Sequence, residues 1–336
     1  MSVAGHGSLT RRSRGGATLT AVVSRVLLAS PRGFCAGVER AVDTVERALR
    51  LYGEPVYVRK QIVHNSHVVH DLEERGAIFG DALEDVPEGA TVVFSAHGVS
   101  PAVRSAADER RLVAIDATCP LVTKVHTQAR RYADAGYTII LVGHAGHEEV
   151  EGTMGEAPEA TVLVESIADA EALELPTDAR VAYITQTTLS VDETREIIDV
   201  LRRRFPQLQG PAREDICYAT SNRQWAVKEL LPHVGFMLVV GSRNSSNSVR
   251  LVEVARAAGV RAELVDDADE IDEEWLDGVE TVGVTSGASA PEHLVGEVCR
   301  WFRDRGVDEI VEGRSVFEDV VFKLPVELRR AERSAA

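Results

Sequence analysis

The sequence has no hydrophobic run long enough to cross a membrane, since no stretch approaches the roughly 18 uncharged apolar residues that a spanning helix needs. It is also short of positive charge, because 37 Lys and Arg stand against 53 Asp and Glu, a formal net charge of −16. That balance argues against a nucleic-acid or membrane-surface partner. The patterns GxxxxGK[ST] and GxGxxG are both missing, which leaves a nucleotide or dinucleotide cofactor without support.

Cysteine is scarce as well, with 4 in 336 residues and none in a CxxC pair. This usage favours reduced thiols or metal ligands over a disulfide framework. The N-terminal stretch "RRSRGGATLTAVVSRVLLAS" imitates a secretory signal, but Ser24 and Arg25 interrupt its apolar part. We therefore expect a disordered basic tail over residues 1–23, a first buried strand at Val26 to Ala29, and a cytoplasmic protein.

The dominant pattern is a short apolar strand, a turn and an amphipathic helix, which predicts an α/β fold. The strand candidates are "VLLAS" (26–30), "PVYVR" (55–59), "TVVFSA" (91–96), "YTIILVG" (137–143), "VAYITQ" (181–186), "FMLVVGS" (236–242) and "ETVGVTSG" (280–287). Most of them end in small or polar residues, and ligand-binding loops lie at such strand ends in open parallel sheets.

Three of the cysteines, Cys35, Cys119 and Cys217, each precede a segment with helical spacing of apolar residues. They are 84 and 98 residues apart, as expected if three related α/β units point equivalent turns at one shared centre. Cys299 differs, because it lies in the middle of a helical pattern on its apolar face. We expect it to be a small buried hydrophobic residue.

Cysteines at helix N-termini suit a metal centre, since the helix dipole and backbone N–H groups favour thiolates. The pattern also fits three unrelated core cysteines, or a zinc ion held by three thiolates and a histidine. Structural zinc usually draws on closely spaced cysteine pairs. Widely separated single ligands suit an iron–sulfur cluster, and three ligands instead of four leave one iron open to a substrate.

Polar residues follow most of the expected strands, and each of them alone is more often a turn residue or an ordinary histidine. Gathered at strand ends, they predict a pocket of neutral hydrogen-bond donors that binds a phosphate or diphosphate without many lysines. The candidates are His64, His67, His70, His97, His144, His147, Glu149, Thr187, Thr188, Ser245, Ser246, Asn247 and Ser289.

Long ordered blocks of the sequence resemble one known family. The blocks are "PRGFCAGVERA", "VHN", "FSAHGVS", "DATCPLVTKVH", "GHAGHEEVEGTMG", "TQTTLSVDET", "DICYATSNRQ", "GSRNSSNSVRL" and "GVTSGASAPE". From about Val26 to Leu328 the chain is similar to the 4-hydroxy-3-methylbut-2-enyl diphosphate reductases, the last enzymes of the methylerythritol phosphate route to isoprenoids.

The resemblance implies three α/β units in pseudo-threefold arrangement around one [4Fe-4S] cluster with an open iron, bound by Cys35, Cys119 and Cys217. It implies that Glu149 and Thr187 lie near the reacting carbon and its hydroxyl, with Glu149 as the proton donor. The implied diphosphate-binding residues are His64, His97, His147, Ser245, Ser246, Asn247 and Ser289.

The implied reaction removes the allylic hydroxyl of 4-hydroxy-3-methylbut-2-enyl diphosphate with two electrons and two protons. It gives isopentenyl diphosphate and dimethylallyl diphosphate plus water. A one-electron donor protein such as ferredoxin or flavodoxin is implied, because the sequence has no flavin or nicotinamide site of its own. Quinolinate synthase, which has a comparable three-unit architecture but not these blocks, and an electron-carrying cluster protein are the alternatives.

The resemblance implies a division of the chain into three units and two flanking segments. We also expect a monomer. Residues 24–36 contribute a first strand to the third unit, and residues 311–336 form a C-terminal tail. The units themselves cover residues 37–118, 119–214 and 215–310. One departure from the family is Glu148, where a proline is common; we expect this carboxylate to point away from the pocket.

Overall fold

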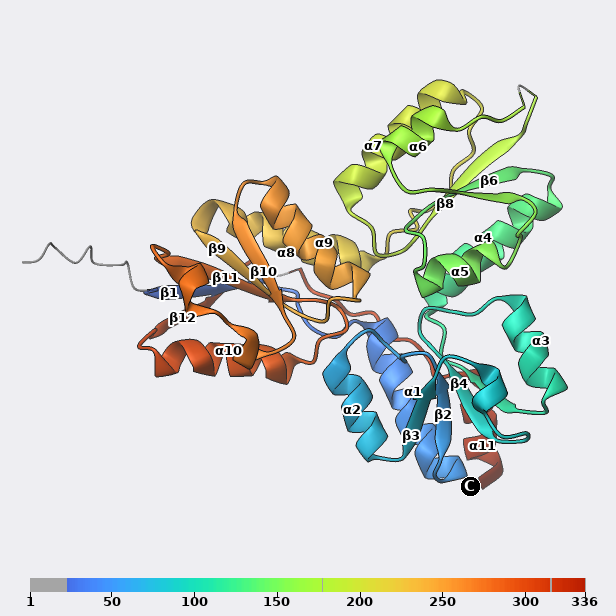
Figure 1. Cartoon of the computed structure of the whole chain (residues 1–336), viewed down its shortest axis with the longest axis horizontal. Coiled ribbons are helices and arrows are strands. Elements are labelled where there is room, and N and C mark those ends of the chain that lie inside the picture. Colours follow the sequence, from blue (N-terminus) through green and yellow to red (C-terminus); the bar gives the residue numbers. More distant parts are fainter. Residues whose placement is uncertain (1–22, 177, 315, 336) are drawn as a thin grey trace, which may run out of the picture.

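The computed structural model describes residues 23–335 with the exception of 177 and 315. Apart from Val23, the basic tail expected over residues 1–23 lies outside the described residues. The described chain forms three parallel β-sheets flanked by helices, and these three lobes meet around a common centre (Figure 1). The predicted α/β class and the three-unit arrangement are confirmed by this architecture.

The first lobe is a four-stranded sheet of order β3-β2-β4-β5. Helices α1 and α2 pack on one face and α3 on the other, so both faces are covered, as parallel sheets require. The elements are α1 (Ala36–Tyr52), β2 (Val56–Arg59), α2 (Ser66–Glu74), β3 (Ala77–Gly80), the short 3₁₀ turn η1 (Leu83–Asp85), β4 (Thr91–Phe94), α3 (Pro101–Glu109) and β5 (Val113–Asp116).

The second lobe is a three-stranded sheet of order β7-β6-β8. Helices α4 and α5 cover one face, and α6 and α7 cover the other. The elements are α4 (Pro120–Asp134), β6 (Thr138–Val142), α5 (Glu148–Met154), β7 (Thr161–Val164), α6 (Ile167–Ala172), β8 (Val181–Thr185) and α7 (Val191–Arg204).

The third lobe is a five-stranded sheet of order β10-β9-β11-β1-β12, in which the first strand of the chain pairs with two late ones. Helices α8 and α9 pack on one face and α10 on the other. The elements are β1 (Arg25–Leu28), α8 (Tyr218–Leu230), η2 (Leu231–His233), β9 (Phe236–Val240), α9 (Ser246–Ala257), β10 (Arg261–Val265), η3 (Ala268–Glu270), η4 (Glu273–Leu276), β11 (Thr281–Ser286), α10 (Glu292–Asp304) and β12 (Glu309–Glu312).

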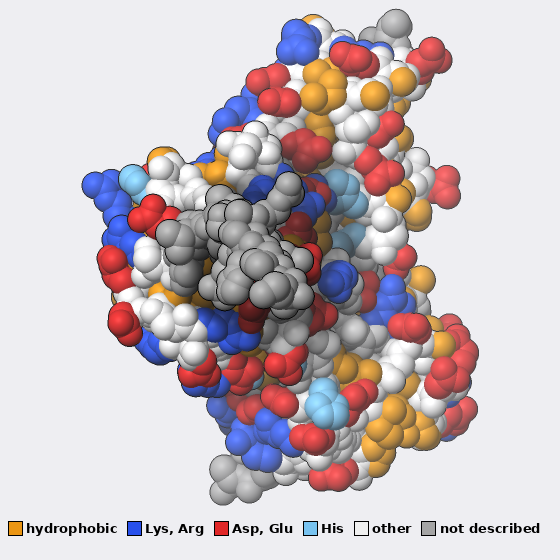
Figure 2. All heavy atoms as spheres, turned by 60° about the vertical axis from the view of Figure 1, so that its left-hand side comes forward, with side chains coloured by type: hydrophobic (Ala, Val, Ile, Leu, Met, Phe, Trp, Pro, Cys, Tyr) orange, Lys and Arg blue, Asp and Glu red, His pale blue; other side chains and the backbone are white. Residues whose placement is uncertain are grey.

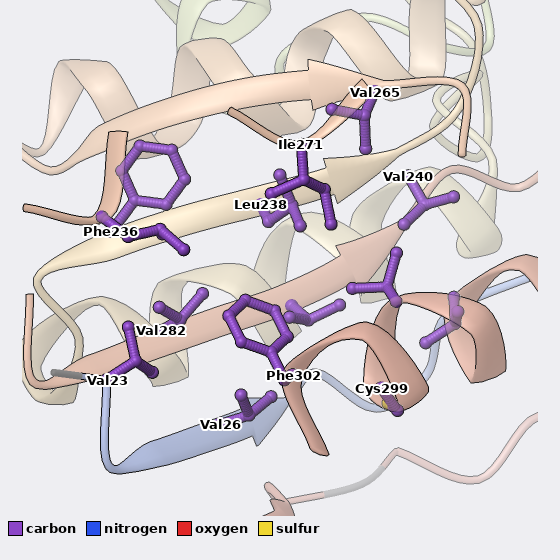
Figure 3. Close-up of a cluster of buried hydrophobic side chains, with 14 of the residues drawn as sticks. Val23, Val26, Phe236, Leu238, Val240, Val265, Ile271, Val282, Cys299 and Phe302 are labelled. Atoms are coloured by element: carbon purple, nitrogen blue, oxygen red, sulfur yellow. The ribbon is translucent and has the colours of Figure 1, made fainter. Parts of the chain in front are cut away.

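The third sheet shows why its central strands are apolar throughout. Along β9, Phe236 and Leu238 point into the cluster under α10, whereas Met237 and Val239 point into the cluster under α8 and α9. Figure 3 shows the first of these clusters, with Val26 of β1 beside Val282 of β11. Because both faces are buried, every residue of β9 is apolar.

The chain ends on a lobe other than the one in which it begins. After β12, residues 313–325 lead to α11 (Val326–Ala335), which packs against α1 of the first lobe (Figure 1). The side chain of Leu328 is fully buried there, and Arg47 of α1 pairs with Glu332 at 2.8 Å. The segment expected as a C-terminal tail thus contains the last residues of β12 and the helix α11.

On the face drawn in Figure 2, acidic and basic side chains are interspersed. Within the ranges that the structure describes, no helix combines the length and the apolar character needed to cross a membrane.

Candidate active site

Each of the three cysteines that the sequence singles out is the N-cap residue of a helix: Cys35 of α1, Cys119 of α4 and Cys217 of α8. The helix starts are those that the periodicity predicts. Pro120 follows Cys119 directly, at the first helical position, where a missing N–H costs nothing. Cys299 lies within α10 and is buried in the apolar cluster of Figure 3, which confirms its expected structural role.

One central cavity of about 100 Å³ brings together the predicted residues from all three lobes. Its lining includes every residue that the sequence assigns to the cluster, the diphosphate and the proton transfer. These are Cys35, Cys119, Cys217, His64, His97, His147, Glu149, Thr187, Ser245, Ser246, Asn247 and Ser289. Most of them follow the carboxyl ends of β2, β4, β6, β8, β9 and β11, where open parallel sheets bind ligands.

The three cysteine thiols are buried, and burial raises the pKa of each one, to about 12 for Cys119 and about 11 for Cys217. They are free of disulfides. A metal centre would bind them as thiolates and release their protons. A Cβ atom on Gly37 would stand only 2.8 Å from the Cys119 sulfur, so glycine at this position leaves room for that sulfur.

The spacing of the sulfurs bears on the kind of metal centre. Among the described residues, one set of three His, Cys, Asp or Glu ligand atoms lies within 4.8 Å of one another, and the cysteines are not that set. A single zinc ion with Zn–S bonds of about 2.3 Å holds its sulfurs within roughly 4.6 Å. The three thiols do not form such a compact set in this structure, whereas a cluster of several irons spans more space. The donors fit an iron–sulfur cluster.

Three histidines form a compact group beside the cysteines. The rings of His64 and His97 stack with centroids 3.9 Å apart, and His147 meets both edge-on at 5.5 and 5.8 Å. Burial lowers the pKa of His64 and His147 to about 3 and that of His97 to about 4. All three rings are therefore neutral at pH 7 in the free protein, and each neutral ring carries a single N–H.

The third lobe supplies hydroxyl and amide groups. Ser245 caps α9, and its Oγ lies 3.3 Å from the Oγ of Ser289, which in turn donates to the backbone oxygen of His64 at 2.9 Å. Asn247 accepts from the Ala288 N–H at 2.7 Å with its side-chain oxygen, which leaves its amide NH₂ as the donor. Ser246 Oγ lies 3.0 Å from Thr188 Oγ1 of the second lobe. These bonds fix the donors before any ligand arrives.

Glu149 and Thr187 are joined by two hydrogen bonds. The backbone N–H and the hydroxyl of Thr187 donate to the two Glu149 carboxylate oxygens at 2.7 and 2.9 Å. Glu149 is 2% exposed, and burial raises the pKa of its carboxyl group to about 7, partly offset by the two Thr187 bonds. A carboxyl group whose pKa lies near neutral pH is suited to giving up a proton.

Glu148 does not line the cavity, in agreement with the expectation that its carboxylate points away from the pocket, but it contacts a residue that does. Its carboxylate Oε2 points at the first lobe, 3.2 Å from Nδ1 of His97 and 3.3 Å from Oγ of Ser95. In an extended loop neighbouring side chains would alternate, but residue 148 begins α5. In a helix, successive side chains are about 100° apart, so Glu149 lines the cavity while Glu148 reaches His97 of the first lobe.

Other candidates lie elsewhere. His67 pairs with Asp267 at 3.1 Å and His70 with Glu74 at 3.4 Å on the surface, and neither lines the cavity, nor does His144. Sequence reasoning missed Thr220, whose hydroxyl lies 3.2 Å from the Cys217 sulfur and accepts from the Asn247 amide at 3.3 Å. Its place three residues after an N-cap is the signal that points to it.

The fold and the cavity together define a three-lobed α/β protein with a cysteine-lined centre and a polar ligand pocket. A family model described as LytB protein matches residues 26–303, so the chain belongs to the LytB family. Membership implies an iron–sulfur cofactor, and the resemblance found in the sequence blocks is thereby confirmed.

Two relatives that this chain resembles are both named 4-hydroxy-3-methylbut-2-enyl diphosphate reductase. The protein from Acidothermus cellulolyticus is 62% identical over 307 residues, 91% of this chain and 90% of its own length. That from Streptomyces avermitilis is 57% identical over 313 residues, 93% of each chain.

Solved structures agree with this assignment. The Plasmodium falciparum E-1-hydroxy-2-methyl-but-2-enyl-4-diphosphate reductase aligns with a TM-score of 0.90 and 38% identity, over 93% of this chain and 99% of its own. A second structure, of an (E)-4-hydroxy-3-methyl-but-2-enyl diphosphate reductase, aligns with a TM-score of 0.59 and 33% identity. The alignment covers 84% of this chain and 100% of that one.

Proposed function

We propose that this chain reduces 4-hydroxy-3-methylbut-2-enyl diphosphate to isopentenyl and dimethylallyl diphosphates. The allylic C–O bond breaks, two electrons and two protons enter, and the oxygen leaves as water. The observation that carries the proposal is the gathering of cysteines, neutral donors and one buried acid around a single cavity. The family membership favours this reaction over that of quinolinate synthase.

The cofactor we propose is one [4Fe-4S] cluster with Cys35, Cys119 and Cys217 as its only protein ligands, so that one iron stays open to substrate. When bound, such a cluster supplies Lewis acidity and electrons one at a time. The three cysteines precede three different helices, α1, α4 and α8, and each of them lies near the start of one unit.

The diphosphate is bound by donors of all three lobes, namely His64, His97, His147, Ser245, Ser246, Asn247 and Ser289. These groups carry little formal charge, which suits a chain of net charge −16. Anchoring the diphosphate folds the rest of the substrate towards the cysteines and converts binding energy into orientation.

Glu149 donates the proton, and Thr187 is its hydrogen-bonding partner in the relay. The Thr187 hydroxyl stands next to the acid at 2.9 Å, so it can pass a proton on while accepting another from Glu149. Because hydroxide is a poor leaving group, this proton makes the departure as water possible.

The direct test is anaerobic purification, iron and sulfide analysis, and turnover of the allylic diphosphate with a reduced viologen dye. We expect about four iron and four sulfide per chain and formation of both products. Intact cluster without turnover of this substrate would contradict the function, and the absence of iron and sulfide would contradict the cofactor.

The remaining features of the proposal are a ferredoxin or flavodoxin as electron donor, a monomeric state and a cytoplasmic location. We also propose that the units comprise residues 37–118, 119–214 and 215–310, with residues 24–36 completing the third. Analytical ultracentrifugation and reduction by each donor protein test the first two of these features.

A further inference from the structure

The contact between Glu148 and His97 joins two lobes inside the cavity wall. His97 follows β4 of the first lobe, and Glu148 begins α5 of the second. The side chain of His97 is 15% exposed and that of Glu148 is 14% exposed, and Nδ1 of the imidazole lies 3.2 Å from the carboxylate oxygen. The same oxygen accepts from the Ser95 hydroxyl at 3.3 Å, so the carboxylate is held in place from two sides.

The direction of this hydrogen bond determines what His97 offers a ligand. A carboxylate only accepts, so Nδ1 must carry the hydrogen. In a neutral imidazole the other nitrogen, Nε2, is then a bare acceptor. Toward an oxygen of an anion, His97 becomes a donor at Nε2 only when the ring carries a second proton.

The surroundings keep the ring neutral until an anion arrives. Burial, with Lys60 as the lesser cause, lowers the pKa of His97 to about 4 in the free protein. The groups that face this ring are the stacked His64, the edge-on His147, the Lys60 ammonium and the Glu148 carboxylate. A bound diphosphate adds negative charge on the open side, so that anions flank the ring and favour the imidazolium.

We propose that Glu148 is a positioning residue that makes His97 take up one proton from solvent when a diphosphate binds, so that an imidazolium holds the anion. The inference rests on the proposed function, since it requires a diphosphate in this cavity. The proton ends on Nε2 of His97, and no electrons move. Without the cation between them, the buried carboxylate and the diphosphate would repel one another.

A metal ion is the other chemistry that these side chains suggest, since ligand atoms of His64, His97 and Glu148 lie within 4.8 Å of one another. The ring geometry argues against it. A metal lies near the plane of each imidazole that binds it, where the nitrogen lone pair points. The His64 and His97 rings are stacked at 3.9 Å with only 14° between their planes, so one ion cannot lie in both.

The test is calorimetric titration of the cluster-loaded protein with inorganic pyrophosphate at pH 8, in buffers of different ionisation enthalpy, which reports protons taken up per site. The variants are Glu148→Gln, which keeps the hydrogen bond but loses the charge, and His97→Gln. Glu159→Gln removes the same charge from an exposed position outside the cavity and is the control. Pyrophosphate's own ionisation is common to all samples and cancels in the differences.

We expect Glu148→Gln and His97→Gln each to take up about one proton fewer than the wild type, and Glu148→Gln to bind about tenfold more weakly. The control should match the wild type. Equal proton uptake in the wild type and Glu148→Gln, or full uptake in His97→Gln, overturns the inference although pyrophosphate binds. If the wild type binds no pyrophosphate, the proposed function fails instead. The cluster's visible spectrum verifies that each variant is folded.

Discussion

At the scale of single residues, the acid at Glu149 carries the sharpest expectation. Glu149→Gln keeps the size of the side chain and its bond from the Thr187 N–H, but it has no proton to give. We expect kcat to fall by about two to four orders of magnitude while KM stays close to the wild-type value. Steady-state turnover with a saturating electron donor measures this, and a wild-type kcat would assign the proton to another group.

The pH profile tests the same residue independently. Because burial raises the pKa of Glu149 to about 7, the protonated form predominates below that pH and is lost above it. We therefore expect kcat/KM to decline as the pH rises through about 7, and this limb to be missing from the residual activity of Glu149→Gln. A profile whose alkaline limb is identical in the two proteins would contradict Glu149 as the acid.

Asn247 offers a test of anchoring apart from chemistry. Loss of one donor to a charged ligand costs roughly 1.5–3 kcal/mol, so Asn247→Ala should raise the substrate Kd about tenfold or more. The cluster's visible spectrum should not change. Asn222→Ala removes an amide that bonds Glu318 outside the cavity and serves as the control. An unchanged Kd in Asn247→Ala would remove this residue from the site.

Single residues also show which features of the site can be predicted from the sequence and which cannot. The cavity residues could be predicted because each follows a strong apolar strand or starts a helix, and the structure gathers them in one place. The contact of Glu148 with His97 could not be predicted, because the direction of the Glu148 side chain depends on whether residue 148 lies in the loop or in the helix. A shift of one residue in a helix start turns a side chain by about 100°, and element boundaries are the least certain part of sequence-based prediction.

At the scale of elements, the helix starts distinguish the cysteines. Cys→Ser at positions 35, 119 and 217 should each abolish bound iron and sulfide, because each of these cysteines is the N-cap residue of a helix and lines the cavity. Cys299→Ser should keep the cluster, since α10 places its side chain in an apolar core. Iron and sulfide analysis per chain checks this. Full retention at any of the first three sites would contradict the ligand set.

Detection of a strand from the sequence follows its place in the sheet, with β8 as the exception, because it is an edge strand that is buried along its whole length. All seven that the sequence indicates are present as β1, β2, β4, β6, β8, β9 and β11. The five that it does not indicate, β3, β5, β7, β10 and β12, are all edge strands. An edge strand is covered less fully, so β12 reads Glu-Ile-Val-Glu and has no buried residue. Its sequence therefore lacks the continuous apolar run that marks a central strand.

At the scale of the whole molecule, the last helix stabilises a lobe built from early residues. Leu328 of α11 is 0% exposed in the core that α1 forms with the first sheet. Leu328→Ala should lower the free energy of unfolding by about 3 kcal/mol, because it leaves a cavity in that core. Denaturant titration measures it.

Val326→Ala is the matched control for that substitution. It shortens an apolar side chain of the same helix at a position that is 41% exposed, so we expect a change within about 0.5 kcal/mol. A similar loss in both variants would mean that the effect comes from weakened helix formation in α11, and the docking of Leu328 would then not be its cause.

The position of β1 between β11 and β12 has a consequence for biosynthesis. Residues 25–28 pair with residues 281–284 and 309–312, so the sheet that carries Ser245 to Asn247 stays unfinished until nearly the whole chain has left the ribosome. Pairings this distant in sequence form late and slowly. Cys35 leaves the ribosome early, yet its turn is anchored by a backbone bond to Ala288. We therefore expect the proposed metal centre to be inserted only after synthesis of the polypeptide is complete.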